Sequence, residues 1–207
     1  MPDYHIPLIP DKTYHIFSRA MGNEKLFLEE ANYKFLLKQF LKYISPVADT
    51  FAYNLLPNHF HFMVRIKNIN TIHEEFLRVK KNKKFIIESI PDFIMERFSN
   101  LLNSYTKAIN KKYSRIGGLF IDIMRRVEVK DDGQLGATIF YIHKNAVHHG
   151  YTENISEWYW SSYQAFISNA PTQLLRDEVL DWFGGIEQFI EFHKQPVYLK
   201  SAVMVEE

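Results

Sequence analysis

TFAYNLLPNHFHFMVRI, residues 50–66, is the segment that decides the fold. Residues 50–56 and 59–66 are rich in β-branched and aromatic side chains, and Pro57-Asn58 between them is typical of a turn. The segment therefore predicts a β-hairpin. Side chains alternate across a sheet, so the apolar set of the second strand, Phe60, Phe62 and Val64, points to the core. His59 and His61 then project from the opposite face.

Further strands and helices flank this hairpin. Residues 13–18 and 125–130 have strand-like composition, and three longer segments carry apolar side chains at intervals of three and four residues, as amphipathic helices do: 29–44, 92–111 and 135–148. The first six elements match the split βαβ plan. We therefore predict an α+β fold, a ferredoxin-like antiparallel sheet with helices on one face. A C-terminal extension from about residue 170 is expected to add one or two packed helices.

Composition limits the classes of protein that fit the chain. It has 207 residues, 46% of them hydrophobic, and no cysteine. Disulfide scaffolds, thiol nucleophiles, zinc knuckles and iron–sulfur clusters are excluded, so His, carboxylate, amide or water would have to hold any metal. We find no run of 18 apolar residues and no secretory signal, which leads us to expect a cytoplasmic protein without a membrane span.

The charges are distributed unevenly along the chain. Residues 65–130 hold fifteen Lys and Arg against seven Asp and Glu, net +8, whereas residues 151–207 hold three against nine, net −6. Basic clusters interleaved with aromatic rings such as Tyr113 and Phe120 suit a phosphate backbone with unpaired bases, although each cluster alone is also typical of a solvated face. The candidate nucleic-acid-binding residues are Lys80, Lys81, Lys83, Lys84, Lys107, Lys111, Lys112, Arg115, Arg125 and Arg126.

His59 and His61 form a candidate metal site. Two residues apart on one strand, they are about 6.5 to 7 Å apart along it and can converge on one divalent cation. A third protein ligand and open positions for water or substrate are still needed. A pair of surface histidines beside a turn is the other interpretation of this pattern.

The helix over 135–148 offers that further ligand. Tyr141, Asn145 and His148 share its polar side, while Leu135, Ile139, Ile142 and Ala146 form its apolar side. The amide oxygen of Asn145 can bind a metal, and Tyr141, one turn earlier, would place its hydroxyl beside the same ion. A tyrosine that only packs in the core would give the same pattern.

Four segments together resemble a known family, the single-tyrosine HUH transposases, and most closely the bacterial branch associated with repetitive extragenic palindromes. They are TYHIFSRAMGNEKLF (13–27), LLPNHFHFMVR (55–65), YIHKNAVHHG (141–150) and WYWSSYQAF (158–166). The four segments span most of residues 13–166, so we expect a transposase-like catalytic domain over residues 1–169. The element pattern leaves a basic insertion near 67–91 and a helical extension over residues 170–207 outside the split βαβ plan.

The resemblance also implies an enzyme that nicks and joins hairpin-bearing single-stranded DNA during DNA transposition. Tyr141 matches the nucleophile, which forms a 5′-phosphotyrosine intermediate. His59 and His61 match the metal-binding histidines, and Asn145 matches the residue that completes the site for Mg²⁺ or Mn²⁺. His148, on the same side of the helix as Tyr141, is a candidate base, and a solvent-facing residue at the helix end is the other interpretation. Relatives of this kind work as monomers or as homodimers.

Two positions depart from the family pattern and leave other functions open. The family often has a basic pair after its Gly-x-Leu-Phe turn and Asn-Pro-Val-Arg after the tyrosine, whereas this chain has Ile121-Asp122 and Asn145-Ala146-Val147-His148. Altered DNA preference is one interpretation, and a catalytically inactive or domesticated nucleic-acid-binding regulator on the same scaffold is another. A third is a zinc hydrolase that uses His59, His61 and one more histidine.

Overall fold

A computed structural model of the chain describes residues 3–81, 84–122 and 124–196. Its centre is an antiparallel sheet with the strand order β2-β3-β1-β4. The strands are β1 (Thr13–Arg19), β2 (Ala48–Leu56), β3 (His59–Ile66) and β4 (Arg125–Val129). The helix α1 (Glu30–Tyr43) connects β1 to β2, and α3 (Ile90–Tyr113) lies between β3 and β4 in the chain. This connectivity confirms the predicted α+β, ferredoxin-like class.

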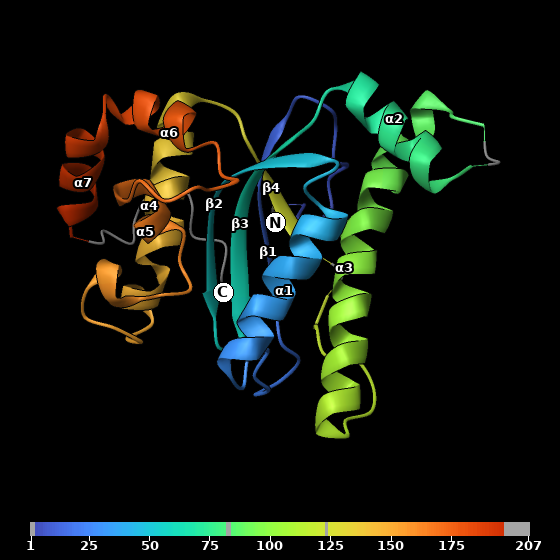
Figure 1. The fold of residues 1–207 in the computed structure, drawn as a ribbon, viewed down its shortest axis with the longest axis horizontal. Helices are drawn as coiled ribbons and strands as arrows, with labels where there is room; N and C mark the ends of the chain where they lie inside the picture. Colours follow the sequence, from blue (N-terminus) through green and yellow to red (C-terminus); the bar gives the residue numbers. More distant parts are fainter. Residues whose placement is uncertain (1–2, 82–83, 123, 197–207) are drawn as a thin grey trace.

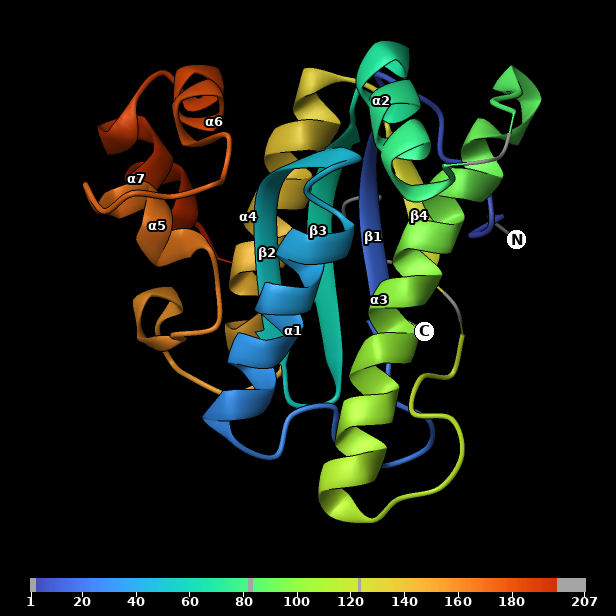
Figure 2. The ribbon, with the colours of Figure 1, turned by 45° about the vertical axis from the view of Figure 1, so that its right-hand side comes forward.

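The helices α1 and α3 lie side by side on one face of the sheet (Figures 1 and 2). They bury the apolar set of β3, which packs in one cluster with Leu36 and Phe40 of α1 and with Phe98 of α3. Phe40 stacks on Phe62 with ring centroids 4.1 Å apart. Burial of this face fixes the register of β3, because a slip by one residue would turn His59 and His61 into the apolar core.

The helices α1 and α3 are those predicted for one face, but the opposite face of β2 and β3 is covered by α4 (Asp132–His148), so the sheet has helices on both sides (Figure 2). The prediction of helices on one face was incomplete, because periodicity shows that a helix is amphipathic but not which face it covers. Two C-terminal helices pack against α4, α6 (Arg176–Phe183) and α7 (Ile186–Lys194). The short helix α5 (Tyr163–Ile167) contacts α4 through the rings of Tyr163 and Phe166, which lie beside His143. The three helices share a second core with Phe51, Met63 and Ile139. The expected helices after residue 170 are therefore present as α6 and α7, and they support the helix that carries Tyr141.

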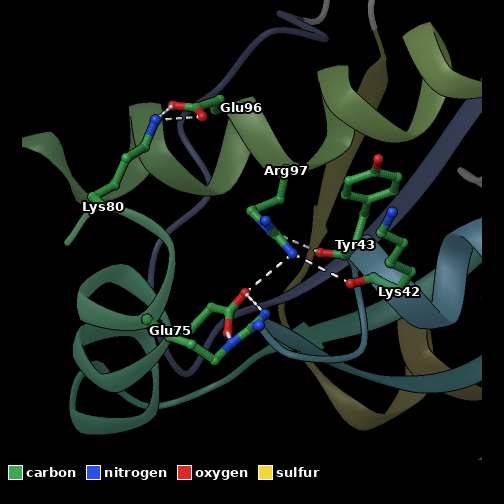
Figure 3. A network of polar contacts seen from close by, with 7 residues as sticks. Lys42, Tyr43, Glu75, Lys80, Glu96 and Arg97 are labelled. Atoms are coloured by element: carbon green, nitrogen blue, oxygen red, sulfur yellow. Dashed lines mark hydrogen bonds and ion pairs between the residues drawn. The ribbon is translucent and has the colours of Figure 1, made fainter.

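The basic segment near 67–91 contains a helix that the sequence pattern did not indicate, α2 (Ile69–Val79), and a short 3-10 turn, Ile87–Ser89. A buried ion pair joins Glu75 of α2 to Arg97 of α3 with 3.0 Å between the charged atoms, and Arg97 also donates to the main-chain oxygens of Lys42 and Tyr43 (Figure 3). Lys80 pairs with Glu96 beside it. These contacts fix α2 to α3 and to the end of α1.

Within the described ranges, none of the helices combines the length and the apolar character that crossing a bilayer requires.

Candidate functional site

His59 and His61 lie on the α4 side of the sheet and are enclosed there. His59 opens β3 directly after the Pro57-Asn58 turn, and only 8% of its surface is exposed, while His61 is fully buried. The centroids of their rings are 5.2 Å apart. The two imidazoles are therefore not a solvated surface pair, and burial of this kind demands polar partners.

The helix α4 supplies those partners. Its residues Leu135, Ile139 and Ile142 enter the second core, which turns Asn145 and Tyr141 toward β3. The side-chain oxygen of Asn145, Oδ1, lies 3.0 Å from Nε2 of His59. The ring centroid of Tyr141 lies 5.6 Å from that of His61. The histidine pair and the tyrosine–asparagine pair thus meet in one pocket, and all four side chains belong to a single chain.

The hydrogen bonds of His59 test whether this pocket suits a cation. Its Nδ1 lies 2.7 Å from the side-chain oxygen of Asn58, which only accepts, so Nδ1 donates and the lone pair of the neutral ring is on Nε2. In this neutral form Nε2 and the side-chain oxygen of Asn145 direct their lone pairs to one point in the pocket, whereas in a protonated ring Nε2 donates to that oxygen. Two ligands of an octahedral Mg²⁺ at right angles are also about 3 Å apart. The donor atoms therefore fit a divalent cation.

A third histidine, His15 of β1, belongs to the pocket although the sequence patterns indicated only a strand there. Its Nε2 lies 2.9 Å from Nδ1 of His61, and its ring centroid is 5.9 Å from that of Tyr141. Because Nδ1 of His61 contacts His15, coordination by His61 would use Nε2. His15 is thus positioned as an outer partner that fixes the orientation of the His61 ring. Side chains alternate along β1, so His15 lies on the other face of the strand from the apolar Tyr14 and Ile16. This alternation is the one sequence signal that could have identified His15 as part of the pocket.

The described part of the chain contains no group of three or more His, Asp or Glu side chains that could together hold a metal ion. Three histidines are present, but His15 approaches through the far nitrogen of His61. His59, His61 and Asn145 are the side chains of this pocket that could hold a metal ion, and water or substrate would have to complete the coordination sphere.

Two other histidines of α4 differ in their surroundings. His148 is exposed at the end of the helix, and its ring contacts that of His149, which in turn lies 4.9 Å from the ring of His59. His143 is buried, where its Nε2 lies 2.8 Å from Ser162 Oγ and its Nδ1 lies 3.0 Å from Nε2 of His193. Burial and the neighbouring His193 lower the pKa of His143 well below its usual value. His143 therefore connects α4 to α7.

The basic residues expected to contact DNA lie in different surroundings. Arg126 is buried and donates to the main-chain oxygens of His5, Ile6 and Met124, and burial lowers its pKa. Four others form ion pairs with carboxylates: Lys80 with Glu96, Lys112 with Glu29, Arg115 with Glu24 and Arg125 with Asp122. Exposed side chains without an ion pair to another described residue are those of Lys81, Lys84, Lys107 and Lys111. Lys83 lies outside the described residues.

Comparison with known proteins gives a structural neighbour. No family model matches the chain, and no curated protein matches its sequence. A solved structure, described as the REP-associated tyrosine transposase bound to a REP hairpin, superposes with a TM-score of 0.60 and 15% identity. The match covers 84% of this chain and 90% of the other. At this identity the likeness shows that the two chains share a transposase-like fold.

Proposed function

We propose that this protein is a transposase that nicks and joins hairpin-bearing single-stranded DNA, with Tyr141 as nucleophile. The observation that carries the proposal is the meeting of two pairs of side chains in one pocket: Asn145 Oδ1 lies 3.0 Å from His59 Nε2, and the Tyr141 ring lies beside that of His61. A phenol next to two imidazoles and an amide oxygen suits nucleophilic attack on a phosphodiester.

In the proposed reaction, the hydroxyl oxygen of Tyr141 attacks the phosphorus of the scissile phosphodiester. The bond from phosphorus to the 3′ oxygen breaks as the new bond forms, which leaves a 5′-phosphotyrosine and a free 3′-hydroxyl. The phenol proton goes to solvent or to a nearby base, and a proton is taken up by the departing oxygen. The energy of the broken phosphodiester bond is conserved in the phosphotyrosine ester, so a 3′-hydroxyl of another strand can attack that ester and release Tyr141.

The pocket supports a metal-dependent version of this chemistry. His59, His61 and Asn145 would hold Mg²⁺ or Mn²⁺, which when bound draws negative charge from the phosphate and from the departing 3′ oxygen. Asn58 and His15 orient the two imidazoles, so that each presents the required nitrogen.

The partner that we propose is a DNA hairpin with a single-stranded flank. The structural neighbour is described as bound to a REP hairpin. In this chain, the exposed Lys107 and Lys111 lie on α3, and Asn103 lies one turn before Lys107. Such side chains contact phosphates without reading the sequence of the bases. We therefore place the hairpin backbone along this side of α3.

Incubation of the full chain with hairpin-bearing single-stranded DNA and Mn²⁺ tests the proposed function. We expect a covalent protein–DNA adduct on a denaturing gel, and we expect the variant Tyr141→Phe to form none. Tyr159→Phe is the matched control, because Tyr159 is 71% exposed and its ring packs against Trp160 outside the pocket. No adduct from the wild type, or an equal adduct from Tyr141→Phe, overturns the proposal.

A nucleic-acid-binding regulator without cutting activity is the second candidate. The observation that favours it is Asp122, at a position where the related transposases often carry a basic residue. Its carboxylate lies 3.2 Å from His5 Nε2 and 3.8 Å from Arg125 Nε, so it offsets positive charge in this loop. Hairpin binding by the wild type without any adduct would support this second candidate.

A further inference from the structure

Arg19 is the last residue of β1 and lies directly opposite His59 in the pairing of β1 with β3. Alternation along β1 places its side chain on the same face as His15, while the next residue, Ala20, is buried in the core on the other face. Directly opposite residues of an antiparallel pair have Cβ atoms about 4.5 to 5.5 Å apart. Arg19 is thus a cation at the edge of the candidate metal pocket.

The main chain around Arg19 is fixed on both sides. The amide of Ile121 donates to the carbonyl oxygen of Arg19 at 3.0 Å, and the amide of Ala20 donates to the carbonyl oxygen of Asn58 at 2.7 Å. Asn58 is the residue whose side chain orients His59. The guanidinium of Arg19 therefore extends from a rigid strand end that is continuous with the pocket.

Arg19 differs from the other arginines of the chain in its contacts. The sequence has eight arginines, and all lie in the described ranges. Seven have guanidinium groups that contact carboxylates or main-chain oxygens of the protein: Arg65, Arg78, Arg97, Arg115, Arg125, Arg126 and Arg176. The side chain of Arg19 is exposed and has no hydrogen bond or ion pair to any other described residue. Its donors are available to a ligand from solution.

From this placement we infer that Arg19 binds a phosphate of the single-stranded DNA at the edge of the pocket, next to the ligands of the proposed metal. The inference rests on the proposed function for the identity of the strand. Guanidinium is planar and donates two parallel hydrogen bonds, which match two non-bridging phosphate oxygens. Negative charge on those oxygens increases as Tyr141 attacks, so the interaction strengthens in the transition state.

The test uses a hairpin oligonucleotide with single-stranded flanks, and a series in which one uncharged methylphosphonate replaces each flank phosphate in turn. Removal of one such donor typically lowers a rate by about 10²- to 10³-fold, so we expect Arg19→Ala to lower the rate of adduct formation by about that factor. On the oligonucleotide whose methylphosphonate replaces the phosphate bound by Arg19, the wild type and Arg19→Ala should form the adduct at equal rates. The reason is that this oligonucleotide lacks the charge that Arg19 binds. Arg19→Lys should retain part of the rate.

Equilibrium binding of the same oligonucleotides to Tyr141→Phe, with and without Arg19→Ala, separates this inference from the proposed function. We expect Arg19→Ala to weaken binding about tenfold or more. For the oligonucleotide that lacks the charge bound by Arg19, we expect equal affinities with and without this substitution. Lys12→Ala is the control, because Lys12 is an exposed cation just before the opposite end of β1 and lies on no surface that we assign to DNA.

If no adduct forms but the methylphosphonate dependence persists in binding, the proposed function fails and the inference about Arg19 holds. Three outcomes would each overturn the inference. Arg19→Ala could leave both the rates and the affinities unchanged, or it could lower them equally for every oligonucleotide of the series. The third is that Tyr141→Phe binds none of the oligonucleotides.

Discussion

His59 and Asn145 show how single residues prepare this pocket. The side-chain oxygen of Asn58 accepts a hydrogen bond from Nδ1 of His59, so in the neutral ring the lone pair on Nε2 faces the side-chain oxygen of Asn145. The amide nitrogen of Asn145 is buried and makes no hydrogen bond within the described structure. Burial of such a donor costs about 1–3 kcal/mol. With its oxygen directed into the pocket, Asn145 is oriented as a metal ligand has to be.

The contact between His15 and His61 gives a prediction for metal binding. His15→Phe keeps an aromatic ring but removes the nitrogen 2.9 Å from His61 Nδ1. Loss of such an outer partner typically lowers metal affinity by about 10- to 100-fold. We expect a decrease of that size in Mn²⁺ affinity, measured by titration followed by electron paramagnetic resonance.

Two further variants make this measurement specific. His15→Gln, which can offer an acceptor at the same place, should restore part of the affinity. His73→Phe changes an exposed histidine on α2, remote from the pocket, and should leave the affinity unchanged. Equal Mn²⁺ affinity in wild type and His15→Phe would show that His15 does not position His61.

At the scale of elements, the attachment of α2 depends on a charge pair with almost no exposure. Glu75 and Arg97 each expose 6% of their side chains, and burial is the main cause that lowers the pKa of Arg97. Glu75→Ala leaves the guanidinium buried without its carboxylate, and breaking a pair in this way typically costs about 3–5 kcal/mol. We expect a loss of that size in the free energy of unfolding, measured with urea.

Glu74→Ala is the matched control for that variant. Glu74 is the exposed neighbour of Glu75 on α2, and we expect its replacement to change stability by less than about 0.5 kcal/mol. Similar unfolding midpoints for the two variants would contradict the importance of the Glu75–Arg97 pair.

The attachment of α7 to α4 predicts a pH dependence of stability. Burial lowers the pKa of His193 to about 4, below its value of 6.5 in an unfolded chain, and the charge of Lys144 acts in the same direction. Between these pH values the unfolded chain binds the additional proton. The stabilisation is therefore complete above about pH 6.5 and is lost as the pH falls toward 4, by roughly 3 kcal/mol in total.

Urea unfolding at a series of pH values from 7.5 to about 4 measures this effect. His193→Leu should flatten the dependence over this interval, because it removes the group that titrates. The buried His143 contributes with the same sign and should leave a residual slope in that variant. If the free energy of unfolding of the wild type stays constant down to pH 4, His143 and His193 are not neutral, buried histidines between α4 and α7.

At the scale of the whole molecule, local patterns predicted more of the fold than of its contacts. Alternation and helical periodicity indicated each strand of the sheet and the helices α1, α3 and α4, since each element buries one side. They missed α2, although its buried residues Ile72 and Phe76 are one helical turn apart, because the segment was interpreted from its lysines alone. They also gave no indication that α4 lies over β2 and β3, because periodicity identifies an apolar stripe but not the surface that it covers.

The same limit applies to the pocket. The patterns identified His59, His61, Tyr141 and Asn145 separately, and a resemblance joined them, but the approach of residues more than 80 positions apart is a property of the folded chain. His15 and Arg19 were missed because their relevance depends on the pairing of β1 with β3. Arg126 was counted as a surface cation, although carbonyl oxygens of the N-terminal segment satisfy its guanidinium inside the protein.

Peptide mapping of the covalent product tests the central claim most directly. The wild-type chain is incubated with hairpin-bearing single-stranded DNA and Mn²⁺, digested with nuclease and protease, and analysed by mass spectrometry. We predict that the residual nucleotide is attached to the hydroxyl of Tyr141, in the peptide that also contains Asn145. Attachment at any other residue, or no attached nucleotide, would contradict the assignment of this pocket as the site of strand cleavage.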